Sequence, residues 1–112
     1  MEKIVEIKTI TGKKILCTIK GIAGTETVSF INTKAIKIAL KKAKKDGECL
    51  DLTGFNLKDA NLSNIDLSGV CLKRANLKGA NLKKANLERA NLESANLEGA
   101  KLNNANMECA VL

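Results

Sequence analysis

The second half of the chain repeats every five residues, and this period limits the possible folds more than any other feature. Leucine recurs at every fifth position from Leu52 to Leu102 and again at Leu112, with Met107 in the one remaining place. A second apolar residue stands two positions before each of these, and it is alanine from Ala75 onward. Asn or Asp occupies most of the positions between the two. Internal repeats indicate a repetitive architecture, so the period outranks local propensities.

A period of five fits neither an α-helix nor a flat strand. On a helix, five residues turn 500°, so each leucine would lie about 140° from the last and the set would surround the helix. On a strand, a step of five would move each leucine to the opposite face. A bend after every unit removes the conflict. Four bends make a square coil of about 20 residues, and successive coils stack through strand-type hydrogen bonds at about 4.8 Å.

We predict that the repeated leucines and the methionine point inward and form the core of this stack. This core ladder consists of Leu52, Leu57, Leu62, Leu67, Leu72, Leu77, Leu82, Leu87, Leu92, Leu97, Leu102 and Met107. The alanines also face inward, near the bends. Asn and Asp suit the bends because their side chains form hydrogen bonds with nearby backbone groups. The last two residues of each unit are expected to face water and to vary freely.

These units resemble the A-(N/D)-L-X-X signature of the pentapeptide-repeat proteins. Two typical copies are Ala75-Asn76-Leu77-Lys78-Gly79 and Ala85-Asn86-Leu87-Glu88-Arg89. The resemblance covers residues 50–112, a little over half of the chain. It implies a mainly β fold, a right-handed quadrilateral β-helix of about three coils.

The first part of the chain has a different pattern. Residues 4–10 and 14–19 are rich in apolar and β-branched residues, which is typical of strands. Thr11 and Gly12 lie between them, so we predict a β-hairpin. Residues 27–31 are a candidate for a third short strand.

A helix is predicted to follow at about residues 33–46. Asn32 or Thr33 is a suitable N-cap, and Gly47 a suitable stop. Residues 1–49 would then form a small ββα-type unit. This unit resembles the opening of short phage and prophage members of the family.

We expect this helix to cap the solenoid, because the end of a β-helix exposes apolar core and unpaired strand edges. The predicted contact consists of Ile36, Leu40 and Phe55. Large residues replace alanine early in the repeat, at Leu50, Phe55, Ile65 and Val70. Either the first coil is wider or touches the cap, or the repeat tolerates any apolar residue there. Binding of the basic helix to a membrane surface or a partner is the alternative. The apolar stripe is narrow and lacks aromatic residues, so we expect no membrane contact.

No cap is recognisable at the other end. The repeat runs to the last residue, so an open end would expose Leu102, Met107 and Leu112. We predict a possible homodimer through this C-terminal coil. A frayed last coil and a chain that stops early are the alternatives.

The excess positive charge lies mainly before the repeat. Residues 1–49 hold 11 Lys and five acidic residues, a charge of +6, whereas residues 50–112 hold eight basic and seven acidic residues. Members of the family that protect DNA gyrase are thought to imitate duplex DNA, and such mimicry needs a long acidic rod. A short, nearly neutral solenoid in a basic chain argues against action on gyrase or topoisomerase. We also expect no dedicated role in nucleic-acid binding, because both phenylalanines, Phe30 and Phe55, are expected in the core and no binding motif is present.

Residues 20 apart are expected to stack on one face of the solenoid. Lys73 then lies over Glu93, and Lys78 over Glu98. Opposite charges in such positions can pair across coils, at about 0.2–1 kcal/mol each. A solvated surface of mixed charge is the simpler interpretation.

The sequence argues against an enzyme. It has no His, no nucleophile–base pair and no Gly-rich phosphate loop. The four cysteines, Cys17, Cys49, Cys71 and Cys109, have no zinc spacing, and we expect free thiols. We therefore predict no catalytic residue, no cofactor and no metal.

The prediction is a non-enzymatic structural or protein-interaction module, bacterial or from a phage, with an unknown protein partner. The first residues lack the apolar stretch of a signal peptide, so a cytoplasmic location is expected. No stretch approaches the roughly 20 apolar residues of a membrane span.

Overall fold

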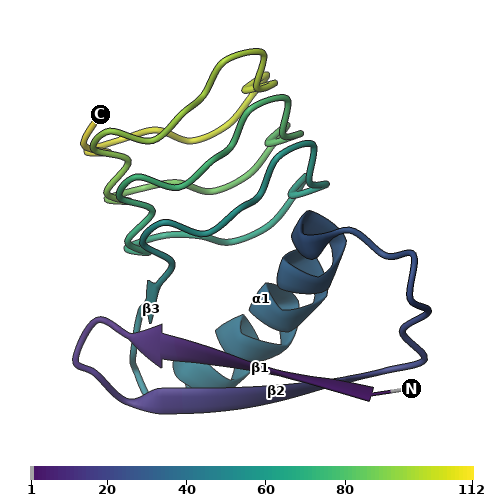
Figure 1. Ribbon diagram of the computed structural model, residues 1–112. Coiled ribbons are helices and arrows are strands. Elements are labelled where there is room, and N and C mark those ends of the chain that lie inside the picture. The colour runs from purple at the N-terminus through teal and green to yellow at the C-terminus, as the bar shows by residue number, and fades with distance from the viewer. Residues whose placement is uncertain (1) are drawn as a thin grey trace.

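The computed structural model describes residues 2–112 and shows a hairpin and one helix followed by a β-helical solenoid (Figure 1). The elements in chain order are β1 (Glu2–Thr9), β2 (Lys14–Lys20), α1 (Val28–Lys45) and β3 (Leu50–Asp51). The three strands form one antiparallel sheet in the order β2-β1-β3. Helix α1 lies between the hairpin and the solenoid (Figure 1).

The hairpin expected from the two apolar segments forms. Ile7 pairs with Ile15 and Val5 with Cys17, and one face of each strand is buried. At the turn Gly12 has a φ of 91°, in the left-handed region that glycine adopts at little cost.

The helix begins earlier than the sequence predicted, at Val28 instead of residue 33, and the expected strand at 27–31 is wrong. The N-cap is Thr27, whose Oγ1 accepts a hydrogen bond from the backbone N–H of Phe30 at 3.2 Å. Thr33, one of the two predicted caps, lies inside the helix and donates to the carbonyl of Ser29.

The physical reason for this error is tertiary packing. Valine, phenylalanine and isoleucine favour strands by propensity. In the structure, however, Ile31 is buried together with Ala35, Ile36 and Ala39, at spacings of three to four residues. Burying this helical stripe outweighs the weak local preference for a strand.

Bridges between residues 20 apart build the solenoid. Cys71 forms parallel bridges to Asp51 on one side and to Asn91 on the other. The backbone N–H of Leu52 donates to the carbonyl of Cys71 at 2.7 Å, and the N–H of Cys71 donates to Leu50 at 3.0 Å. The same pattern recurs in the following units, so each coil is hydrogen-bonded to the next.

Most units contain a turn stabilised by an Asn or Asp side chain, whereas Cys71 and Lys101 occupy that position in two of the units. In one unit the Asn76 Oδ1 accepts a hydrogen bond from the backbone N–H of Lys78 at 3.1 Å. The last residue of each unit from Gly54 to Cys109 has a positive φ, as Gly79 does at 68° and Lys84 at 60°. This position was expected to vary freely, but the turn confines its backbone to the left-handed region, which costs a non-glycine residue about 1–2 kcal/mol.

The core runs without interruption from the hairpin through α1 into the solenoid. Every ladder leucine from Leu52 to Leu92 is at most 1% exposed. Leu97, Leu102 and Met107 are only half-buried. These three residues lie in the last coil of the described residues. No further coil covers them there, and this accounts for their exposure.

Leu82 and Leu102 occupy equivalent positions in successive coils, which makes them a matched pair. We expect Leu82→Ala to lower the free energy of unfolding by about 2–5 kcal/mol, because it leaves a cavity in a closed core. Leu102→Ala should cost clearly less, since the side chain is already half-exposed. Urea unfolding of both variants checks this. Equal losses would contradict the burial gradient along the stack.

Candidate functional site

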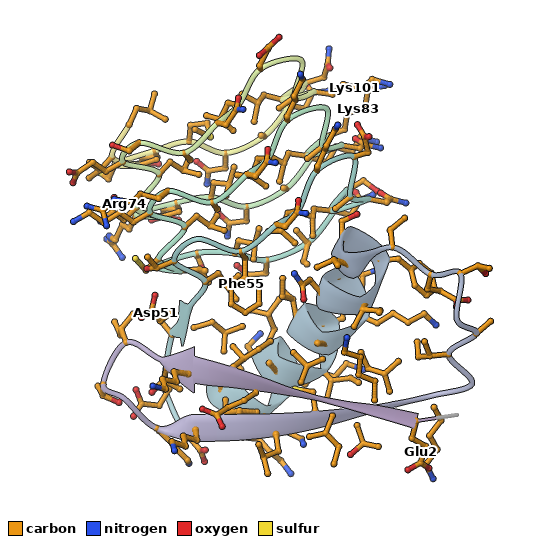
Figure 2. All side chains as sticks on the ribbon, in the orientation of Figure 1. Glu2, Asp51, Phe55, Arg74, Lys83 and Lys101 are labelled. Carbon is orange, nitrogen blue, oxygen red and sulfur yellow. The ribbon has the colours of Figure 1, made fainter. Side chains whose placement is uncertain are left out.

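The first coil, defined as residues 50–69, meets α1 along one side. The Asn32 side-chain amide donates to the backbone carbonyl of Asn56 at 3.1 Å, which ties the first half of the helix to the coil. Of the three predicted contact residues, Ile36 is fully buried, whereas Leu40 and Phe55 are half-buried. Figure 2 shows Phe55 on the side of the first coil that faces α1. Phe30, which was expected in the core, is 41% exposed, with the Lys34 ammonium 5.1 Å from its ring centroid.

A groove of about 630 Å³ opens between the second half of α1 and the first coil. Its apolar lining includes Leu40, Ala43, Leu50, Ile65 and Val70. Its polar lining includes Lys37, Lys41, Lys44, Ser63, Asn64, Asp66 and Ser68. The volume lies in the range of ligand-binding clefts, roughly 300–1,000 Å³.

Sequence reasoning did not find this groove, although a signal for it was present. Ile65 and Val70 stand where later units have alanine, and both line the groove, as does Leu50. The large residues therefore do two things. They fill space against α1, and they provide the apolar floor of the groove beside it.

Lysines form one rim of the groove. Lys37, Lys41 and Lys44 are exposed, and among residues 2–112 none of them forms a salt bridge. The Glu48 carboxylate, which also lines the groove, accepts from the Thr11 hydroxyl at 2.9 Å.

Asp66 on the opposite wall belongs to its own turn. Its Oδ1 accepts from the hydroxyl of Ser68 at 2.7 Å and from the backbone N–H of Ser68 at 3.0 Å. These two bonds hold the pKa of the Asp66 carboxyl below its usual value, and the nearby charge of Lys44 acts in the same direction. Partial burial opposes them without reversing the shift.

A strip of positive charge continues from the groove up one side of the solenoid. Asn64 donates its backbone N–H to the carbonyl of Lys83, so Lys83 and Lys84 lie one coil above the groove wall. Lys101 forms a bridge to Asn81 one coil further on. Figure 2 shows Lys83 and Lys101 at the same side of the stack, with Arg74 at the opposite side.

The predicted opposite-charge pairs stack without forming salt bridges. The backbone of Arg74 donates to Glu93 and that of Gly79 to Glu98, so the expected register is present. Among residues 2–112 the salt bridges join Lys13 to Asp46 and Arg89 to Glu88 instead.

The cysteines do not form a cluster. All four are free thiols: Cys17 is buried, Cys49 and Cys71 are partly buried, and Cys109 is exposed. Burial raises the pKa of the Cys17 thiol, and the charge of Lys42 offsets this only in part. Within residues 2–112 there is no group of three or more metal-ligating side chains. Within residues 2–112, no helix, α1 included, is long and apolar enough to cross a membrane.

The far end of the solenoid carries the residues predicted for self-association. Leu102 and Met107 are half-buried, and Leu112 is 75% exposed. Val111 beside it is 51% exposed.

Comparison with known proteins identifies the repeat. The family model described as pentapeptide repeats (8 copies) matches residues 49–83 and 71–108, which together cover more than half of the chain. The chain belongs to the pentapeptide-repeat family. No curated protein matches this sequence.

Two solved structures of pentapeptide-repeat proteins are similar to this member of the family. Rfr23 from the cyanobacterium Cyanothece 51142 is 39% identical over 55% of this chain and 42% of its own, with a TM-score of 0.53. HetL from Nostoc sp. strain PCC 7120, described as involved in heterocyst differentiation regulation, is 40% identical over 54% of this chain and 29% of its own, with a TM-score of 0.52. This chain therefore spans less than half the length of either protein.

Asp66 allows a test of the turn electrostatics. Asn occupies the equivalent place in the next two coils, at Asn86 and Asn106, so Asp66→Asn should keep the turn. Because the folded-state pKa is lowered, the Asp66 carboxylate stabilises the fold at neutral pH, and this contribution is lost as the pH falls through the folded-state pKa.

The expected result is a smaller loss of stability on acidification in the Asp66→Asn variant than in the natural protein. Urea unfolding at about pH 7 and about pH 3 measures it. The difference should be small, because the side chain is exposed to solvent. An equal or larger loss in the variant would contradict the assigned cause.

Proposed function

We propose that this protein is a non-enzymatic interaction module, built as a right-handed quadrilateral β-helix of about three coils with α1 as its cap. Bridges at a spacing of 20 residues and turns at a spacing of five support this shape, since four units then complete one coil. The protein would act by presenting side chains to a protein partner.

The observation that carries this proposal is the rigid display of outward residues. Both outward positions of a unit are fixed by its turn: Lys78 is hydrogen-bonded to Asn76, and Gly79 to the backbone of Glu98 in the next coil. Because the backbone is already fixed, binding of a partner to these side chains costs little backbone entropy, which favours affinity. The description of HetL as a protein involved in regulation also supports a binding role for the fold.

The alternative, an imitation of DNA that acts on gyrase or topoisomerase, has less support. A DNA mimic needs an acidic face, whereas the strip that includes Lys83, Lys84 and Lys101 is basic. Binding to the partner therefore should not compete with duplex DNA.

A scan of the solenoid faces tests the proposal. The tagged full chain is used to isolate its partner from the source cells, and binding to the purified partner is measured by calorimetry. Four variants replace these residues by alanine, one face at a time: Lys73 with Arg74; Lys58 with Lys78; Lys83 with Lys84; Glu88 with Arg89.

We expect one variant, or two that change neighbouring faces, to weaken binding by at least about tenfold, because a few residues dominate most interfaces. The other variants serve as controls, and circular dichroism should show that all four keep the fold. If no purified partner binds, or if all four variants and variants of α1 bind like the natural protein, the interaction role is wrong.

We also propose that the terminal coil, residues 93–112, mediates a homodimer. The exposure of Leu112 beside the half-buried Met107 supports this, since an apolar end favours association. The combined change of Met107→Glu and Leu112→Glu should convert a dimer into a monomer. Light scattering over a range of concentrations, with reductant present, measures the mass.

Lys101→Glu is the control for this test, because Lys101 lies in the same coil but is exposed. It should leave the dimer intact. A natural protein that is monomeric at every concentration would refute self-association, as would a dimer that the double variant preserves.

A further inference from the structure

We propose that the groove between α1 and the first coil is the docking site for an acidic peptide segment of a protein partner. The segment would place apolar side chains over Leu40 and the edge of Ile65 and would place carboxylates beside the lysines of the helix rim. The proposal rests on the interaction role proposed above and assigns it a surface and a partner chemistry.

The floor of the groove is apolar, and Leu40 is its most exposed part, since Ile65 is 8% exposed and Val70 1%. Leu40 is half-buried although it lies beside the buried stripe of α1, and the groove runs along it toward Ile65 and Val70. Apolar grooves of this kind bind every second side chain of an extended peptide, or the side chains on one face of a helical peptide. An open groove beside a helix therefore suits a chain segment.

The lysines of the rim share one face of α1. Lys37, Lys41 and Lys44 follow the spacing of four and then three residues that places side chains one above another on a helix. The helix dipole accounts for basic residues in the last turn only. Lys37 and Lys41 precede that turn. Their charges are thus available to a ligand.

The groove also holds two carboxylates, Asp66 and Glu48, against the three lysines of the rim, so its lining keeps a small excess of positive charge. Asp66 is engaged by the hydroxyl and N–H of Ser68, and Glu48 by Thr11. Above the groove the strip of Lys83, Lys84 and Lys101 extends the positive field over successive coils. Such a field steers an acidic ligand toward the groove and increases its association rate.

Peptide is favoured over the other polyanions by the composition of the groove. Proteins that bind single-stranded nucleic acid without sequence preference stack the bases on aromatic side chains, and no aromatic residue lines this groove. Phosphates would also leave the apolar floor unused. A lipid surface is flat, whereas this floor is recessed beside the helix. An acidic peptide that also carries apolar side chains matches both the apolar floor and the basic rim of the groove.

The test begins with a phage-displayed library of random 12-residue peptides selected on the full chain. Selected peptides are synthesised, and their dissociation constants are measured by fluorescence anisotropy. We expect acidic peptides that carry several apolar residues. They should shift the methyl NMR signals of Leu40, Ile65 and Val70.

Charge reversal then locates the site. The variant Lys37→Glu, Lys41→Glu, Lys44→Glu should weaken peptide binding by at least about tenfold. The control variant reverses Lys3, Lys14 and Lys58, which are exposed and lie outside the groove, so it has the same net charge. It should stay within about twofold of the natural protein, apart from a screened long-range effect.

A second variant allows the proposal to be tested even if the triple substitution disturbs the fold of α1. Ile65→Ala introduces the residue that later coils have at Ala85 and Ala105, so the repeat should tolerate it. It removes part of the floor and should weaken peptide binding several-fold. It should leave the effect of salt on peptide affinity unchanged.

Three results would overturn the proposal: no peptide is selected, the selected peptides are neutral or basic, or the groove and control variants bind alike. Binding of duplex DNA or anionic vesicles to the groove in place of peptide would also overturn it. If the purified partner binds a solenoid face and ignores the groove variants, the groove is excluded and the interaction role stands. If no purified partner binds at all, the interaction role fails, whatever the peptides do.

Discussion

The backbone hydrogen bonds between residues 20 apart are the constraint on which the rest of the structure depends. Each coil donates to and accepts from its neighbour, as Cys71 does with Leu50 and Leu52. The chain can meet this requirement only if it closes one circuit in 20 residues. One inward leucine and one turn in each unit then follow. Buried backbone groups find partners in the stack, and the leucines fill the space that the circuit encloses.

The same constraint creates a problem at the ends of the stack. A coil with a neighbour on one side only leaves backbone groups and apolar side chains open to water. At the first coil, α1 and the large residues Leu50, Ile65 and Val70 occupy this space. A helix and a coil have different outlines, so the contact is incomplete. The groove is the remaining gap, and it combines an apolar floor with a basic rim.

The residue types on the surface of the solenoid are limited by a different requirement from those in its core. Every unit presents two outward side chains, but the last of them must accept a left-handed backbone. Glycine meets this demand at little cost, and asparagine and aspartate tolerate it better than most residues, whereas Lys84 and Arg89 do so at a higher cost. That cost is offset by the hydrogen bonds between coils. The stack can therefore carry lysines at positions whose local conformation does not favour them.

The sequence by itself determined the coil and its interior. A period of five excludes straight helices and strands, and it placed Leu52 to Leu92 in a core that the structure shows to be closed. Local propensity also identified the hairpin. It failed at residues 28–31, where β-branched and aromatic residues suggested a strand.

Only the tertiary structure decided that those residues are helical, because the burial of Ile31 beside Ala35 is a contact that propensity does not contain. It also decided the groove, since Lys41 and Ile65 are neighbours of one cavity only after α1 has folded against the first coil. Repeats specify their own contacts at a fixed spacing, so the sequence is sufficient there. The junction of helix and solenoid joins two different periods, and its geometry depends on how the two surfaces pack.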